Sequence, residues 1–243
     1  MIPKILHICW FGGKPLPNEA KKYIDTWRKY NPDYEIKLWD ESNFDIKSNT
    51  YVYEAYQSKK YAFVSDYARL KVLYDYGGIY MDTDVEVVKS FDDLLEYPAF
   101  IGFEAPDRFS TATMASAANN LWVKMLLKNY DNKRFILEDG NFDMTTNVTI
   151  ITGSTLDKYP VLLNDTLQVF DNFAVLPFEY LCAKDIDSGK IKRTPNTYTI
   201  HHYSGSWLPR RKKFVKMVTS IFGYRFVGFL VKIKQAFKRG KSK

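Results

Sequence analysis

The sequence of 243 residues has only two cysteines, Cys9 and Cys182. Two thiols do not make the disulfide framework of a small secreted protein, so we expect a reducing compartment. Long apolar runs are also missing. No stretch approaches the ~20 apolar residues that cross a bilayer, and the apolar run at the N-terminus is too short for a signal peptide. We therefore expect a cytoplasmic protein that does not span the membrane.

Acidic residues are missing from the last part of the chain, since none follows Asp187. Residues 188–243 carry fifteen lysines and arginines. The first 187 residues hold the other 20 of the 35 basic residues against all 28 acidic ones, a net charge of −8 in a chain whose total is +7. This division indicates a polyanionic surface that only the tail contacts.

The tail, residues 209–243, combines positive charge with apolar side chains at near-helical spacing. These are Phe214, Met217, Val218, Ile221, Phe222, Phe226, Phe229, Leu230, Ile233 and Phe237. The pattern is typical of a basic amphipathic helix on anionic lipid, so we expect residues 210–243 to bind the inner face of the cell membrane peripherally. A solvated or partner-binding helix is the alternative. Nucleic-acid arms rarely need an apolar face, so we expect no nucleic-acid binding.

Residues 1–208 alternate predicted strands with predicted helices, which favours one α/β domain with helices on both faces of a sheet. Strands are expected at 2–10, 34–39, 78–81, 99–103, 111–115, 173–176 and 197–202, and helices at 17–30, in two pieces within 51–76, and at 119–130. A turn that leads into a further helix is expected at residues 150–153. Ligands of such sheets bind at the carboxyl ends of strands, where Trp10 and Asp82 are expected.

The most informative pattern is SDYARLKVLYDYGGIYMDTDVE, residues 65–86. Asp66 and Arg69 are three residues apart and share one face of the predicted helix. Gly77 and Gly78 follow its last apolar turn, where a helix often ends in a left-handed residue that glycine adopts easily.

The strand at 78–81 leads directly to two aspartates. Because side chains alternate across a strand, Asp82 and Asp84 are expected to project to the same side. Two such carboxylates repel each other unless a cation lies between them, and oxygen ligands suit Mg²⁺ or Mn²⁺, ions that usually also hold substrate phosphates.

The combined pattern resembles the Asp-x-Asp sugar-transferase family, which includes yeast-type initiating mannosyltransferases, bacterial capsule and lipopolysaccharide enzymes and the glucosylating domain of clostridial toxins. That family pairs Ser-Asp-x-x-Arg with Gly-Gly-x-Tyr-x-Asp-x-Asp. The matching residues are Ser65, Asp66, Arg69, Gly77, Gly78, Tyr80, Asp82 and Asp84. The resemblance implies a GT-A-type, Rossmann-like mixed sheet. It also implies transfer of a hexose, with retention, from a UDP- or GDP-linked sugar to a glycan or lipid-linked glycan in polysaccharide synthesis.

The resemblance also implies roles for single residues. Asp82 and Asp84 would hold Mn²⁺ or Mg²⁺, which stabilises the departing diphosphate. Asp66 would meet sugar hydroxyls, Arg69 would approach the sugar or phosphate, and Tyr80 would lie near the ribose or phosphate. Arg69 and the two aspartates form the predicted catalytic set.

Three aromatic residues complete the predicted site. Trp10 would stack on the nucleotide base, with an ordinary core tryptophan as the alternative. Trp207 resembles the family's closing tryptophan on a mobile loop that excludes water. His202 has the spacing to Gly205 of a late His-x-x-Gly element and is the predicted third metal ligand. Alternation allows only one of His201 and His202 to face the metal.

The sequence does not single out a catalytic base or nucleophile. Glu104, Asn147 and Thr152 are weak candidates for neighbours of the reacting sugar. Two other functions stay open: a non-catalytic binding protein whose tail contacts nucleic acid or membrane, and a sugar-nucleotide hydrolase or glycosidase. A glycosidase needs a carboxylate pair about 5–9.5 Å apart, a distance that no sequence gives.

Overall fold

The computed structural model describes residues 1–186 and 188–205, so the predicted tail lies outside the described residues. The helices are α1 (Asn18–Tyr30), α2 (Thr50–Gln57), α3 (Tyr61–Tyr76), α4 (Leu121–Leu127), α5 (Asn147–Leu156) and α6 (Phe178–Leu181), with short 3-10 helices at Ile46–Ser48, Asp92–Leu94 and Lys128–Tyr130. The strands are β1 (Ile5–Cys9), β2 (Glu35–Trp39), β3 (Gly78–Met81), β4 (Val85–Val87), β5 (Ala99–Ala105), β6 (Arg108–Ser116), β7 (Gln168–Val169), β8 (Ala174–Leu176) and β9 (Thr199–His201).

The chain divides into two compact units. The first consists of Met1–Lys184 and Ile191–His202 and contains all the helices and strands named above. The second consists of Asp185–Lys190 and Tyr203–Lys243. In its described part, the N–H of Asp185 donates to the carbonyl of Lys190 at 2.9 Å and closes a turn.

The main sheet has seven strands in the order β2-β1-β3-β6-β5-β8-β7. β1 pairs in parallel with β2 and β3, and β5 pairs in parallel with β8. β6 is antiparallel to both β3 and β5. The sheet is therefore mixed, as predicted, and β1, β2, β3, β5 and β8 end at the same edge. A second, two-stranded sheet pairs β4 with β9.

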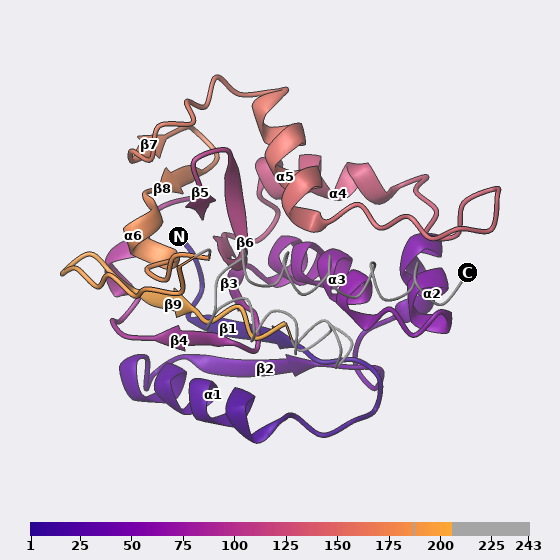
Figure 1. The fold of residues 1–243 in the computed structure, drawn as a ribbon, viewed down its shortest axis with the longest axis horizontal. Coiled ribbons are helices and arrows are strands. Elements are labelled where there is room, and N and C mark those ends of the chain that lie inside the picture. Colours follow the sequence, from indigo (N-terminus) through magenta and orange to yellow (C-terminus); the bar gives the residue numbers. More distant parts are fainter. Residues whose placement is uncertain (187, 206–243) are drawn as a thin grey trace, which may run out of the picture. The chain divides into compact units, whose positions relative to one another are not determined.

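Helices cover both faces of the main sheet, which confirms the predicted layering (Figure 1). Successive side chains of a strand point to opposite faces. Ile79 and Met81 accordingly pack in the core that contains Trp27 of α1. Tyr80 packs in the other core, which contains Val64 of α3. In Figure 1, α1 lies along the lower edge, and α3 lies near the middle with α4 and α5 above it.

Two glycines form the predicted corner between α3 and β3. Gly77 caps α3 with φ 68°, and its N–H donates to the carbonyl of Leu73 at 3.0 Å. Gly78 has φ 100°, and a Cβ at this position would lie 2.6 Å from the carbonyl oxygen of Ile5. The left-handed backbone and the close approach of β1 both require glycine here, so the corner delivers β3 directly to the side of β1.

The two aspartates lie in a turn, not along a strand as predicted. β3 ends at Met81, and the N–H of Val85 donates to the carbonyl of Asp82 at 3.1 Å, which closes a tight turn between β3 and β4. The prediction of a turn at 150–153 was also wrong. α5 already begins at Asn147, because Thr146 caps it by accepting from the N–H of Thr149 at 3.3 Å.

Within the described part of the chain, no helix is both long and apolar enough to cross a membrane.

Candidate active site

Asp82, Asp84 and His201 form a compact cluster just past the end of β3. One side-chain ligand atom from each lies within 4.8 Å of the other two. Nε2 of His201 is 3.4 Å from Oδ1 of Asp84. The side chains of Asp82, Asp84 and His201 are 28%, 15% and 13% exposed, so the cluster is partly accessible to solvent. Two carboxylate oxygens and one imidazole nitrogen are a donor set that suits a divalent first-row cation.

Pairing of β9 with β4 brings His201 to the aspartates. His201 lies opposite Val85 in this sheet, and the N–H of His202 donates to the carbonyl of Asp84 at 2.9 Å. Burial lowers the pKa of His201, but the Asp84 carboxylate and Cys182 outweigh it and raise that pKa to about 10. A cation at this cluster would have to displace that proton, because imidazole binds metal in its neutral form.

His202, the predicted third ligand, points elsewhere. Its Nε2 lies 2.8 Å from Oε2 of Glu86, and its ring stacks on Tyr23 with centroids 4.7 Å apart. Alternation along β9 separates the two histidines, as the sequence suggested. The structure brings His201 to the aspartates and does not bring His202 there.

Arg69 connects the predicted sugar-binding helix to the aspartates. Its guanidinium is 3.0 Å from Asp66 and 3.3 Å from Asp82, and it donates to the carbonyl of Thr111 at 2.7 Å. It also lies over the ring of Tyr80, 4.5 Å from the centroid. Arg69 is only 5% exposed, so these charges interact in a medium that screens them weakly. Four predicted site residues, Asp66, Arg69, Tyr80 and Asp82, therefore form one connected network.

The same network fixes the Asp82 carboxylate. The hydroxyl of Tyr80 donates to Oδ1 of Asp82 at 2.7 Å, and Arg69 approaches the same oxygen. Burial raises the pKa of Asp66 to about 6, while Arg69 opposes this shift and Asp82 adds to it. Burial likewise raises the pKa of Tyr80 well above its ordinary value, so Tyr80 remains a hydrogen-bond donor.

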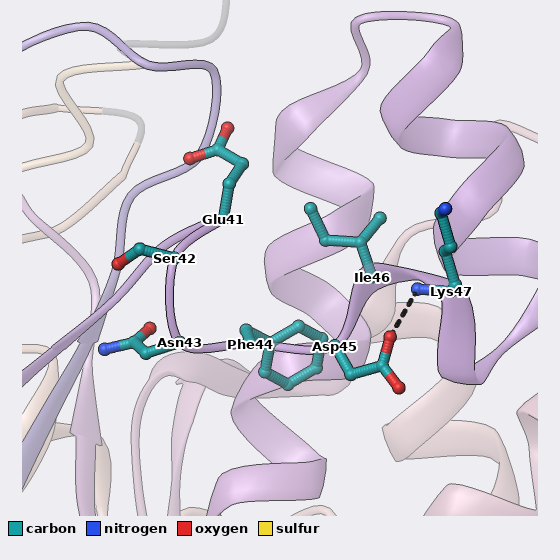
Figure 2. A pocket seen from close by; sticks show the side chains of 7 residues that line it. All are labelled: Glu41, Ser42, Asn43, Phe44, Asp45, Ile46 and Lys47. Atoms are coloured by element: carbon teal, nitrogen blue, oxygen red, sulfur yellow. Dashed lines mark hydrogen bonds between the residues drawn. The ribbon is translucent and has the colours of Figure 1, made fainter.

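Trp10 lies beside the turn at the carboxyl end of β1. Its backbone N–H donates to the carbonyl of Trp39 at 2.9 Å, and its Nε1 donates to the carbonyl of Lys14 at 2.6 Å. Trp10 is partly exposed. The N–H of Gly12 donates to the carboxylate of Glu41, which ties this turn to the loop after β2. That loop forms an open pocket of about 460 Å³ (Figure 2), lined by Glu41, Ser42, Asn43, Phe44, Asp45, Ile46 and Lys47.

Three further residues lie close to this network or to β6. Asn147 at the start of α5 is 2% exposed and donates from Nδ2 to the carbonyl of Asp66 at 3.2 Å. Thr152 accepts from the N–H of Phe109 at 3.1 Å, which ties α5 to β6. Glu104 pairs with Arg108 at 3.0 Å. Trp207 lies outside the described residues.

Sequence reasoning missed the contact of Arg69 with Thr111. The acceptor there is a backbone carbonyl, so no side chain signals it.

The mixed sheet, with an acid cluster at the end of a central strand, defines a GT-A glycosyltransferase fold. The apo form of GlyE, a glycosyltransferase of Streptococcus pneumoniae, has this fold with a TM-score of 0.51. The two are 14% identical, and the match covers 99% of this chain and 64% of that one. The likeness concerns the fold alone.

A family model matches part of the sequence. Residues 17–101 match the family model described as "glycosyltransferase sugar-binding region containing DXD motif", and the motif here is Asp82-Thr83-Asp84. The predicted resemblance to these glycosyltransferases is confirmed over the part of the chain that holds the motif.

Relatives with curated names support the same resemblance. Inositol phosphoceramide mannosyltransferase 3 of Schizosaccharomyces pombe is 33% identical over 136 residues, which are 53% of this chain and 37% of that protein. An uncharacterized glycosyltransferase of Acanthamoeba polyphaga mimivirus is 25% identical over 246 residues, 95% of this chain and 92% of that one. The chain thus matches little more than a third of the yeast relative's length.

Proposed function

We propose that this protein is a divalent-cation-dependent glycosyltransferase that moves a hexose from a nucleotide diphosphate sugar to a glycan or lipid-linked glycan, with retention. The convergence of Asp82, Asp84 and His201 next to the buried Asp66–Arg69 pair carries this proposal. It brings two carboxylates and an imidazole, a donor set that suits a cation, close to a further carboxylate and a guanidinium that would bind sugar or phosphate.

Asp82, Asp84 and His201 would hold the cation, which would act as a Lewis acid on the departing diphosphate. Mn²⁺ fits an imidazole ligand better than Mg²⁺ does. Arg69 orients Asp66 and Asp82 through contacts of 3.0 and 3.3 Å. Asp66 accepts a hydrogen bond from a sugar hydroxyl, since its buried carboxylate lies beside Arg69. The result is a binding surface with little freedom to reorganise.

The nucleotide would lie over the ends of β1 and β2. Trp10 offers a partly exposed ring there, and base–aromatic stacking contributes about 1–3 kcal/mol per base. The open pocket after β2 provides backbone and side-chain polar groups beside it (Figure 2). The resemblance implies UDP or GDP as the candidate nucleotide.

For the acceptor, the names of the yeast relatives favour a mannosyl donor and a phosphorylated lipid acceptor as the first to test. The basic tail at 210–243 would hold the enzyme at the cytoplasmic face of the membrane, where capsule or lipopolysaccharide precursors are built. Removal of residues 210–243 should then abolish co-sedimentation with anionic liposomes.

A thermal-shift screen of UDP- and GDP-sugars, each with and without Mn²⁺, tests the proposal. A bound donor stabilises the fold by mass action, by about 2.7 kcal/mol at a hundredfold excess over Kd. The donor that stabilises in a Mn²⁺-dependent way is then assayed for nucleotide release. Asp84→Ala should abolish the release, and Asp75→Asn, which changes an exposed pair with Lys71 on α3, should not. Salt-sensitive nucleic-acid binding without any Mn²⁺-dependent turnover would favour the non-catalytic alternative.

A further inference from the structure

A third carboxylate, Glu104, lies at the same edge of the sheet as the acid cluster. β5 and β3 are both antiparallel to β6, so they run in the same direction and end at one edge. Only β6 separates them. Neighbouring strands lie about 4.8 Å apart, so β5 runs roughly 10 Å from β3. The end of β5 extends past the end of β3, because Met81 lies opposite Thr113 of β6 and Ala105 lies opposite Arg108.

The order of the strands indicates which part of a bound nucleotide sugar would lie near Glu104, and this step rests on the proposed function. Trp10 at the end of β1 would hold the base, and Asp82 at the end of β3 would hold the diphosphate. The sugar then extends over β6, where Arg69 binds the carbonyl of Thr111 at 2.7 Å. Glu104 at the end of β5 would then lie on the far side of that sugar from the diphosphate.

Glu104 is a buried charge that interacts with the cluster. Its side chain is 10% exposed, and Nε of Arg108 is 3.0 Å from its Oε1. Burial raises the pKa of Glu104, the Asp82 carboxylate adds to the shift, and Arg108 and His201 oppose it. The protein thus keeps a desolvated carboxylate within electrostatic range of Asp82 and His201.

A second buried glutamate shows what a structural carboxylate looks like in this fold. Glu54 uses both oxygens: Oε1 accepts from Arg134 at 2.6 Å, and Oε2 accepts from the backbone N–H groups of Phe135 and Ile136 at 2.8 and 3.0 Å. These bonds outweigh burial and lower the pKa of Glu54. Glu104 has no such backbone donors among the described residues.

We propose that Glu104 is a catalytic residue that contacts the transferred sugar and stabilises the positive charge that develops at its anomeric carbon. The bond from this carbon to the diphosphate oxygen breaks, and its electron pair leaves with the diphosphate. The oxygen of an acceptor hydroxyl, or of water, then bonds to the carbon and passes its proton to the departing diphosphate. Glu104 forms no covalent bond in this step, and Arg108 holds it in place.

The hairpin offers a matched control, because Arg108 also binds Asp107 at 3.0 Å and the Asp107 side chain is 74% exposed. We would compare Glu104→Gln with Asp107→Asn in Mn²⁺-dependent hydrolysis of GDP-mannose or UDP-glucose, whichever stabilises the native protein. Glu104→Gln should lower kcat about 10²-fold, as removal of one electrostatic stabiliser does, and keep the donor-induced thermal shift. Asp107→Asn should leave both unchanged. In Glu104→Ala, added formate should restore part of kcat.

Two results would overturn this assignment. One is a kcat of Glu104→Gln within twofold of the native value. The other is a loss of activity that formate does not rescue and that is accompanied by loss of the donor-induced thermal shift, since that combination marks a structural role. Absence of nucleotide-sugar turnover in the native protein is a distinct outcome, because it would refute the proposed function and this inference with it.

Discussion

Replacement of Arg69 by methionine should destabilise the fold strongly. Arg69 is 5% exposed and lies between two carboxylates, at 3.0 Å from Asp66 and 3.3 Å from Asp82. Without the guanidinium, both carboxylates lose their close cationic partner, and the carbonyl of Thr111 loses its donor. Breaking a buried pair by removal of one partner costs about 3–5 kcal/mol. We therefore expect Arg69→Met to lower the free energy of unfolding by that amount.

The measurement is urea unfolding at neutral pH without added metal. Arg28→Met is the matched control. Arg28 pairs with Asp25 at 2.9 Å, but the two side chains are 63% and 71% exposed, and exposed pairs contribute about 0–1 kcal/mol. The double variant Arg69→Met/Asp66→Asn should recover part of the loss, because a neutral side chain needs no counter-charge. A cost below about 1 kcal/mol for Arg69→Met would refute the view that these charges are desolvated.

Three further predictions follow from buried contacts. Burial lowers the pKa of His7 from 6.5 to about 4, so on acidification the unfolded chain binds a proton at His7 before the folded chain does. The free energy of unfolding should therefore fall by up to about 3 kcal/mol as the pH falls from 6.5 to 4. His7→Gln should flatten this pH dependence in urea titrations. Gly78→Ala should lower the free energy of unfolding by at least ~2 kcal/mol, because the residue has a positive φ and the new Cβ would lie 2.6 Å from a carbonyl oxygen of β1. Gly153→Ala, in open space within α5, should instead raise the free energy of unfolding by about 0.5–1 kcal/mol in the same assay. Tyr80→Phe should weaken Mn²⁺ binding about 10–100-fold by calorimetry, since Tyr80 orients Asp82, a proposed cation ligand. Tyr34→Phe, outside the site, should not change the affinity for Mn²⁺. Equal affinities of the two variants would contradict that role of Tyr80.

The stretch around α3 and β3 could be predicted from the sequence because its determinants are local. The i, i+3 spacing of Asp66 and Arg69 defines a helix face, and the conformation of Gly77 and Gly78 defines a corner. The strand at 78–81 was predicted with the bounds that the structure has.

The choice between the two histidines could not be predicted, because it depends on a non-local register. Alternation shows that His201 and His202 point apart, but only the pairing of β9 with β4 decides which of them faces Asp84. That pairing joins segments more than a hundred residues apart, and nothing within the motif itself encodes it. The contact of Arg69 with a backbone carbonyl was hidden for a similar reason, since any residue at position 111 supplies that carbonyl.

The geometry of Asp82 explains why the motif needs its surroundings. Oδ1 of Asp82 already binds the hydroxyl of Tyr80 at 2.7 Å and lies 3.3 Å from Arg69, so the carboxylate is oriented before a cation or a donor arrives. A cation that binds here therefore spends little free energy on ordering its ligand. The turn at 82–85 and the β4–β9 pairing place Asp84 and His201 around the same point. An isolated Asp-x-Asp on a flexible loop would lack all of these restraints, and this difference in preorganisation distinguishes a cation site from two neighbouring surface acids.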